Sequence, residues 1–262
     1  MKNIGITERG DAALDYTWTE KIQDTDYSVI ITKNTTSERF HKAVLEHKDK
    51  ILLHATITGW GGTEVEPNVP KPHETVASII KLIQKGFPAN QIVWRIDPIL
   101  DVNDDLGLMK AHKAFRNIDA NLKLHGVQRI RVSVFDSYKH ALQRMAQCSI
   151  KTNYTGFQAD NKTFERINRM LDTWKEKGYS IETCAEPKLN AEHVGCVNNK
   201  DAQLFGIDIS ELPKNGQNRF GCLCSTAKTE LLSERKQCAH GCAYCYWKDE
   251  PKKKDISKSC PF

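Results

Sequence analysis

Short apolar segments alternate with amphipathic segments along the chain before residue 185, and this alternation limits the fold more than any other feature. The apolar segments are rich in Ile and Val, and several are apolar on both faces, as strands inside a parallel sheet are. We therefore expect strands at residues 4–7, 28–32, 51–58, 92–96, 130–135 and 180–184. Pro98 is expected to stop the fourth strand.

The amphipathic segments predict helices at residues 37–46, 73–85, 106–124, 136–148 and 161–177. In the second of these, Val76, Ile79, Ile80 and Ile83 recur at helical spacing, and Gly86 follows as a stop signal. Strands that alternate with helices form βαβ units with right-handed crossovers and a parallel sheet. The predicted fold is therefore α/β, a parallel (βα)n arrangement that makes a full or partial TIM-like barrel.

The cysteines are gathered in the last third of the chain. Of nine, eight lie between Cys184 and Cys260. Cysteines that only fill a core would be scattered, so the clustering itself indicates metal binding. No repeat or low-complexity linker marks a domain break before about residue 185. We expect a barrel core at residues 1–185 and a Cys-rich, cluster-binding lobe at residues 186–262 packed on one end of the barrel.

Composition narrows the class of protein further. The chain has 262 residues, 39% of them hydrophobic, and no apolar run approaches the length of a membrane span. Residues 1–7 look like a strand and lack the apolar centre of a signal peptide. We expect a cytoplasmic protein without a membrane partner, in a reducing compartment where cysteines do not form disulfides. The net charge of +5 permits an anionic substrate but does not require nucleic acid.

Cys238, Cys242 and Cys245 have the spacing C-x3-C-x2-C, with Tyr244 before the last thiol. Thiolates are the ligands of iron–sulfur clusters, and three of them leave one iron of a [4Fe–4S] cluster without a protein ligand. The alternative is a structural zinc knuckle, which normally needs four ligands with two-residue gaps. His240 is expected to point outward from this loop rather than to act as a ligand.

This spacing resembles the signature of the radical SAM enzymes. The resemblance implies that the open iron binds S-adenosylmethionine and that the reduced cluster cleaves it to a 5′-deoxyadenosyl radical. It also implies an external electron donor.

Further stretches resemble one bacterial family, the domain of unknown function 1848. They are residues 56–61, 66–70, 94–99, 183–186 and 222–224, together with the terminal cysteine motif. The resemblance implies a radical-SAM-like barrel with its cluster motif at the C-terminus, so that the order of strands relative to the cluster is permuted. It implies no substrate, and the segment 6–11 departs from the family's usual start.

Four more cysteines form a second candidate site. Cys184, Cys196, Cys222 and Cys224 have the right number of thiols for a closed second iron–sulfur cluster or a zinc ion. In one alternative, some of them are only buried small apolar residues. In another, Cys222 or Cys224 completes a single cluster, which would close the open iron and remove chemistry with S-adenosylmethionine.

Charged residues near the ends of predicted strands are candidate catalytic residues. Arg95 and Asp97 are two positions apart, point to the same face and lie where a barrel strand ends, and Glu186 follows the last predicted strand. Ser133, at the end of another strand, is a candidate contact to S-adenosylmethionine. The alternatives are a buried Arg95–Asp97 pair that stabilises the barrel, a loop cap at Glu186, and a solvent-facing Ser133.

Gly61, Gly62 and Glu64 follow a strand directly and faintly resemble the Gly-Gly-Glu strand end that binds S-adenosylmethionine in radical SAM enzymes. An ordinary strand-to-loop turn is the alternative.

Three functions remain open on these grounds. The first is a radical SAM-type enzyme, with nucleic acid or a nucleotide as the first substrate to consider. The second is an iron–sulfur electron carrier or redox sensor that does not use S-adenosylmethionine. The third is a zinc-stabilised binding module.

Overall fold

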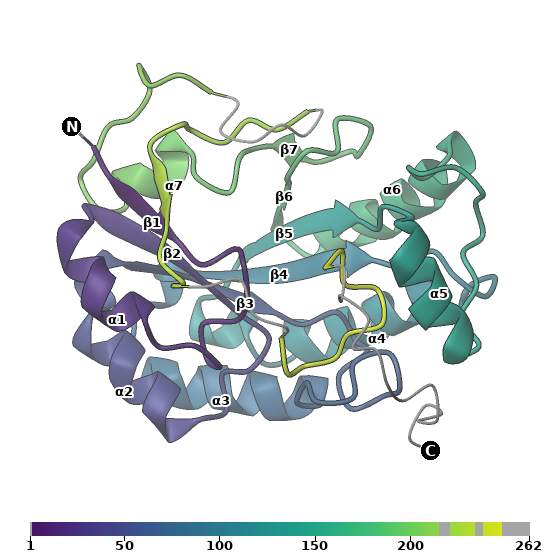
Figure 1. The fold of residues 1–262 in the computed structure, drawn as a ribbon, viewed down its shortest axis with the longest axis horizontal. Helices are drawn as coiled ribbons and strands as arrows, with labels where there is room; N and C mark the ends of the chain where they lie inside the picture. The colour runs from purple at the N-terminus through teal and green to yellow at the C-terminus, as the bar shows by residue number, and fades with distance from the viewer. Residues whose placement is uncertain (1, 215–220, 234–237, 248–262) are drawn as a thin grey trace.

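The computed structural model describes residues 2–214, 221–233 and 238–247 of the chain. Within these residues, eight strands form one sheet in the order β7-β6-β5-β4-β3-β2-β1-β8, and every neighbouring pair is parallel (Figure 1). The strands are β1 (Ile4–Ile6), β2 (Tyr27–Thr32), β3 (Ile51–Thr56), β4 (Ile92–Ile99), β5 (Arg129–Val134), β6 (Ser180–Thr183), β7 (Glu192–His193) and β8 (Lys228–Glu230).

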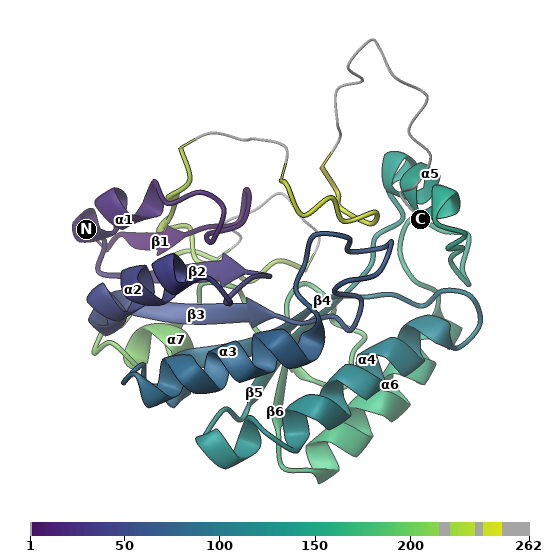
Figure 2. The same cartoon turned by 90° about the horizontal axis from the view of Figure 1, so that it is seen from below.

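The helices lie between the strands in sequence. They are α1 (Trp18–Lys21), α2 (Glu38–Glu46), α3 (Pro72–Gln84), α4 (Leu106–Asp119), α5 (Lys139–Gln147), α6 (Asn161–Glu176) and α7 (Asn199–Gln203). Short 3-10 turns occur at Ile22–Asp24, Lys48–Lys50, Ala89–Gln91 and Lys123–His125. Figure 2 shows α2, α3, α4 and α6 side by side along one face of the sheet.

Helix α6 illustrates why these segments form helices. The side chain of Asp160 accepts a hydrogen bond from the backbone N–H of Thr163 and so satisfies a free donor of the first turn. Phe164, Ile167, Leu171 and Trp174 recur three or four positions apart and are buried against the sheet and neighbouring helices. The amphipathic pattern alone therefore predicts which side of the helix is buried.

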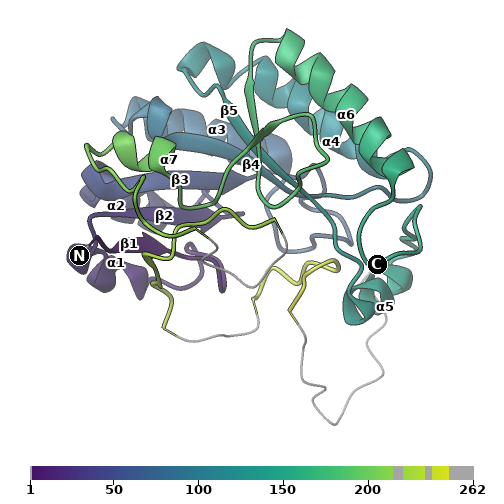
Figure 3. The same cartoon turned by 90° about the horizontal axis from the view of Figure 1, so that it is seen from above.

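The opposite face of the sheet is covered by α7 and by the chain that follows β6 (Figure 3). A second apolar cluster lies there, built from β1 and β2 side chains together with Cys196, Val197, Cys222 and Cys224. Both faces of the central strands are thus buried, which explains why every residue of β2 and β3 is buried.

The α/β class and the parallel sheet predicted from the sequence are confirmed, and all six predicted strands are present. Closure into a barrel is not confirmed, because the sheet ends at β7 and β8 and no pairing joins these edges in the described part of the chain. The two edge strands come from the region after residue 186 and extend the same sheet as the first 185 residues.

The predicted end of the fourth strand is wrong. Strand β4 does not stop before Pro98 but continues to Ile99. The missing N–H of Pro98 is tolerated because the pairing with β5 shifts its register between Ile96 and Ile99, so no ladder bond from Pro98 is needed. The peptide bond between Asp97 and Pro98 is cis.

No helix among residues 2–214, 221–233 and 238–247 has both the length and the apolar character needed to cross a bilayer.

Candidate functional site

The segment 238–245, called the cysteine loop below, lies beside α5 at the edge of the sheet where the strands end (Figure 1). The loop that follows β3 holds it: the backbone N–H of Ala243 donates to the carbonyl of Val65 at 2.9 Å, and the side-chain amide of Asn68 donates to the carbonyl of Ala239 at 2.8 Å. The carboxyl edge of a parallel sheet is where α/β proteins usually bind ligands. The three thiols of the motif therefore lie at the carboxyl edge of the sheet.

His240 attaches the cysteine loop to the segment after β1. Its ring is buried, with Nε2 2.9 Å from a carboxylate oxygen of Asp11 and Nδ1 3.0 Å from the backbone oxygen of Asn68. Burial alone would lower the pKa of His240, but the hydrogen bond and charge of Asp11 raise it above its usual value. The expectation that His240 points outward is wrong, because the buried carboxylate of Asp11 supplies a partner for it.

Tyr244 attaches the loop to the ends of β2 and β3. Its hydroxyl accepts a hydrogen bond from Lys33 Nζ at 2.7 Å and donates one to Glu66. Lys33 also forms an ion pair with Glu66 at 3.0 Å, and Thr58 donates to the other carboxylate oxygen of Glu66 at 2.8 Å. Burial favours neutral Lys33, but the charges of Glu66 and Cys242 outweigh it and raise its pKa, so the ammonium group stays charged.

The thiols of the loop lie close enough to influence one another's charge. Burial, together with the charges of Asp11 and Cys245, raises the pKa of Cys238 to about 11. Burial also raises the pKa of Cys242, and the charges of Glu66, Cys238 and Cys245 act in the same direction. Such thiols keep their protons until a metal replaces them. Three thiols on one short loop beside the Lys33 ammonium group are a donor set that fits a thiolate-bound cluster, although their sulfurs do not all lie within 4.8 Å of one another.

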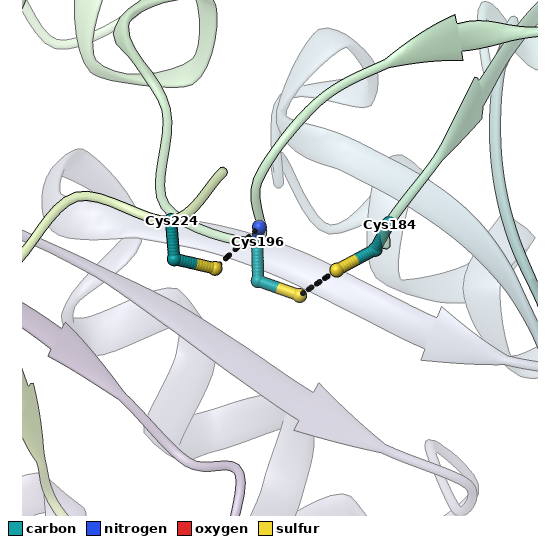
Figure 4. A group of neighbouring side chains, drawn as sticks. All are labelled: Cys184, Cys196 and Cys224. Atoms are coloured by element: carbon teal, nitrogen blue, oxygen red, sulfur yellow. Dashed lines mark hydrogen bonds between the residues drawn. The ribbon is translucent and has the colours of Figure 1, made fainter. Parts of the chain in front are cut away.

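Cys184, Cys196 and Cys224 form a second group of thiols, called the cysteine trio below (Figure 4). All three Sγ atoms lie within 4.8 Å of one another, and those of Cys184 and Cys196 are 3.4 Å apart. Cys184 directly follows β6, Cys196 lies shortly after β7, and Cys224 precedes β8. The trio could therefore hold one metal ion.

Contacts within the trio shift the pKa values of Cys224 and Cys184 in opposite directions. Hydrogen bonds from the thiols of Cys184 and Cys196, and a backbone hydrogen bond from Val197, lower the pKa of Cys224 to about 3. The same contacts with Cys196 and Cys224 raise the pKa of Cys184 well above its usual value. The backbone N–H of Cys196 also donates to Cys224 Sγ at 3.1 Å. The contacts within the trio therefore favour the thiolate form at Cys224 over that at Cys184.

Of the four cysteines predicted for the second site, three converge. Cys222 is buried in the same apolar cluster as Cys196 and Cys224, but its Sγ is not part of the trio. Its role as a ligand stays a prediction, as do the roles of Cys238, Cys242 and Cys245. Cys260 lies outside the described residues.

The predicted catalytic residues Arg95 and Asp97 of β4 form an ion pair, and Ser133 of β5 donates a hydrogen bond to Asp97. The charge of Asp97 and the nearby thiols of Cys196 and Cys184 raise the pKa of Arg95 against the effect of burial. Lys33 Nζ lies 3.4 Å from the backbone oxygen of Asp97. A continuous polar chain therefore runs from beside the trio to the cysteine loop.

Glu186 is buried beside this chain, where a carboxylate oxygen accepts the backbone N–H of Val134 at 3.3 Å. Ser133 is buried too, so the alternative of a solvent-facing position for it is wrong. The catalytic roles proposed for these residues remain predictions.

Gly61, Gly62 and Glu64 lie in the loop after β3. A Cβ on Gly61 would meet the carbonyl oxygen of Pro70 at 2.1 Å, and Gly62 has a φ of +74° beside the side chain of Lys71. Both glycines are therefore required by the packing of the loop itself. Glu64 is exposed. The predicted contact of these residues with a cofactor stays a prediction.

Sequence reasoning missed Asp11, Lys33 and Glu66. Asp11 ends the segment 6–11 and Glu66 opens the stretch 66–70, five and ten residues beyond β1 and β3, whereas Lys33 directly follows β2. Lys33 is a lone charge just after an apolar strand, which is the same signal that singles out Arg95 and Asp97.

The fold and the trio together define an α/β protein with a parallel sheet and a group of three thiols that could bind a metal. The chain belongs to the family described as Domain of unknown function (DUF1848), whose family model matches residues 15–247. No curated protein matches the chain, and no solved structure does.

Proposed function

We propose that the chain is an iron–sulfur enzyme of the radical SAM type. The observation that supports this best is the position of the cysteine loop, with its C-x3-C-x2-C spacing, at the carboxyl edge of a parallel sheet. Contacts with the segments after β1, β2 and β3 hold the loop there.

Cys238, Cys242 and Cys245 would hold a [4Fe–4S] cluster, with one iron left for S-adenosylmethionine. When reduced by an external electron donor, such a cluster supplies the electron that cleaves S-adenosylmethionine to a 5′-deoxyadenosyl radical.

The protein's own residues would set the charge and orientation of this site. Lys33 offsets thiolate charge near Cys242, and Glu66 holds the Lys33 ammonium group in place. Tyr244 fixes the loop through both of them. His240 and Asp11 fix the other end of the loop.

A substrate would meet the polar groups of Arg95, Asp97 and Glu186, and Ser133 would contact the cofactor. Within this proposal the loop of Gly61, Gly62 and Glu64 stays a second candidate for contact with S-adenosylmethionine. A nucleic acid or nucleotide is the first substrate class to test, because the net charge of +5 permits an anionic substrate.

The test is anaerobic purification with iron, sulfide and zinc counted per chain, then electron paramagnetic resonance of the dithionite-reduced protein. We expect a cluster signal that changes when S-adenosylmethionine is added. Cys242→Ala should lose the signal, and Cys148→Ala, outside both groups of thiols, should keep it.

Two outcomes would reject the proposal. A cluster whose spectrum does not change when S-adenosylmethionine is added would indicate an electron carrier or redox sensor. Zinc without sulfide would indicate a zinc-stabilised binding module, which the presence of the trio also supports.

A further inference from the structure

The cysteine trio lies where the two edges of the sheet approach each other. Cys184 and Cys196 flank β7 at one edge, and Cys224 precedes β8 at the other. The two edge strands are not paired, so the described chain leaves this side of the sheet without a hydrogen-bonded ladder.

The segments that carry Cys196 and Cys224 are nevertheless in direct backbone contact. A Cβ on Gly195 would meet the backbone nitrogen of Cys224 at 2.6 Å. The backbone N–H of Ser225 donates to the carbonyl of Val197 at 3.0 Å. The thiols of Cys196 and Cys224 therefore lie close together because backbone contacts join the segment after β7 to the segment before β8.

The spacing of the sulfurs favours one ion over a cluster. Thiolates on one tetrahedral zinc, with Zn–S bonds of about 2.3 Å, lie roughly 3.8 Å apart. The Sγ atoms of Cys184 and Cys196 are 3.4 Å apart, and all three lie within 4.8 Å. The thiolates of a four-iron cluster bind different irons and lie further apart. Three soft ligands on a compact site suit zinc best.

Cys222 is the natural fourth ligand. Its Sγ lies outside the trio, but it is the nearest thiol to Cys224 in the sequence, two positions before it. It is buried in the apolar cluster that contains Cys196 and Cys224. Arg95 and Lys228, which are paired with Asp97 and Glu8, also lie near the trio and place positive charge beside the thiolates.

We propose that Cys184, Cys196 and Cys224, completed by Cys222, bind one zinc ion that fastens the two edges of the sheet together. The site is separate from the cysteine loop and does not depend on the function proposed for that loop. Its role is structural, because four thiolates leave no position for a substrate.

Metal counts on the full chain test the proposal. We expect one zinc per chain in the wild type, in Cys148→Ser and in the variant that carries Cys238→Ala, Cys242→Ala and Cys245→Ala. Cys196→Ser and Cys224→Ser should lower zinc occupancy at least tenfold. Cys222→Ser should retain the site with weaker affinity.

Co²⁺ provides a second readout, which is measured first on the wild-type protein. Added to the metal-free wild type, it should give the ligand-field absorption of a tetrahedral site and a thiolate charge-transfer band. The charge-transfer band should fall by about one quarter in Cys222→Ser, because one of four thiolates is lost. Removal of zinc should speed hydrogen exchange at the Ser225 amide but not in α6.

Several results would overturn the proposal. They are zinc retained fully by Cys196→Ser, an octahedral Co²⁺ spectrum, a disulfide between Cys184 and Cys196, or sulfide retained by the variant that lacks all three loop cysteines. If the protein contains one zinc and a cluster whose spectrum does not change with S-adenosylmethionine, the zinc site is supported and the radical SAM proposal is rejected.

Discussion

The hydroxyl of Tyr244 lies 2.7 Å from the ammonium nitrogen of Lys33, a contact between residues 211 positions apart that joins the cysteine loop to the end of β2. Lys33 is also the cation that balances the buried carboxylate of Glu66, whose side chain is 1% exposed. Loss of one partner leaves the other charge buried without compensation.

Lys33→Met should therefore destabilise the protein by roughly 3 kcal/mol. Chemical denaturation at neutral pH measures this change in the free energy of unfolding. Lys81→Met is the matched control, because Lys81 pairs with Glu38 where both side chains are more than half exposed. The interpretation of Lys33 is wrong if the two variants unfold at the same denaturant concentration.

Arg144 of α5 donates hydrogen bonds to the backbone carbonyls of Ala243, Cys245 and Trp247. One side chain thus orients the part of the chain that carries the last thiol. Arg144→Ala should lower the iron content of anaerobically purified protein at least twofold while the helical circular dichroism is retained. Arg169→Ala changes an arginine that lines the groove between α4 and α6 and should leave the iron content unchanged. Equal iron in both variants would contradict a role for Arg144 in the site.

The sheet could be predicted from the sequence because its central strands are apolar on both faces and are separated by long amphipathic helices. Strands β7 and β8 could not, because they have two and three residues and are only half-buried or exposed. Their positions in the sheet depend on pairing with β6 and β1, and no local sequence pattern indicates this pairing.

The thiols of both groups were recognisable by their number and spacing. Their surroundings were not, since Asp11 reaches His240 across 229 positions and Glu66 reaches Tyr244 across 178. Spacing also cannot show which of Cys222 and Cys224 points toward Cys196, because that depends on how the two edges of the sheet meet.

Acid should weaken the fold through Glu182 of β6. Burial opposes its charge, but Arg131 and Arg129 outweigh burial and lower the pKa of Glu182 from 4.5 to about 2. Because the folded-state pKa is lowered, the stabilisation is complete above about pH 4.5 and is lost as the pH falls toward 2. This lowering of the pKa corresponds to a stabilisation of roughly 3 kcal/mol.

Glu182→Gln should therefore lower the free energy of unfolding at pH 7 by about 3 kcal/mol and flatten its dependence on pH between about 4.5 and 2. Denaturant titrations at several pH values measure both effects. Glu192→Gln, which changes a half-exposed partner of Lys200, should keep the wild-type slope. An unchanged slope in Glu182→Gln would show that other carboxylates control the acid response.

Gly195→Ala tests the close approach of the two sheet edges. The new methyl group would lie 2.6 Å from the backbone nitrogen of Cys224 and 2.7 Å from its Cα, and neither atom can move like the end of a flexible side chain. We expect a loss of roughly 1–3 kcal/mol, as for other overpacked sites. For a chain of this size each kcal/mol lowers Tm by about 2–4 °C.

Gly10→Ala is the control, because its methyl group would meet only the end of the Leu232 side chain at 2.9 Å, which can turn away. Equal Tm values for the two variants would mean that the segments around Gly195 and Cys224 separate at little cost, and that the edges of the sheet are held elsewhere.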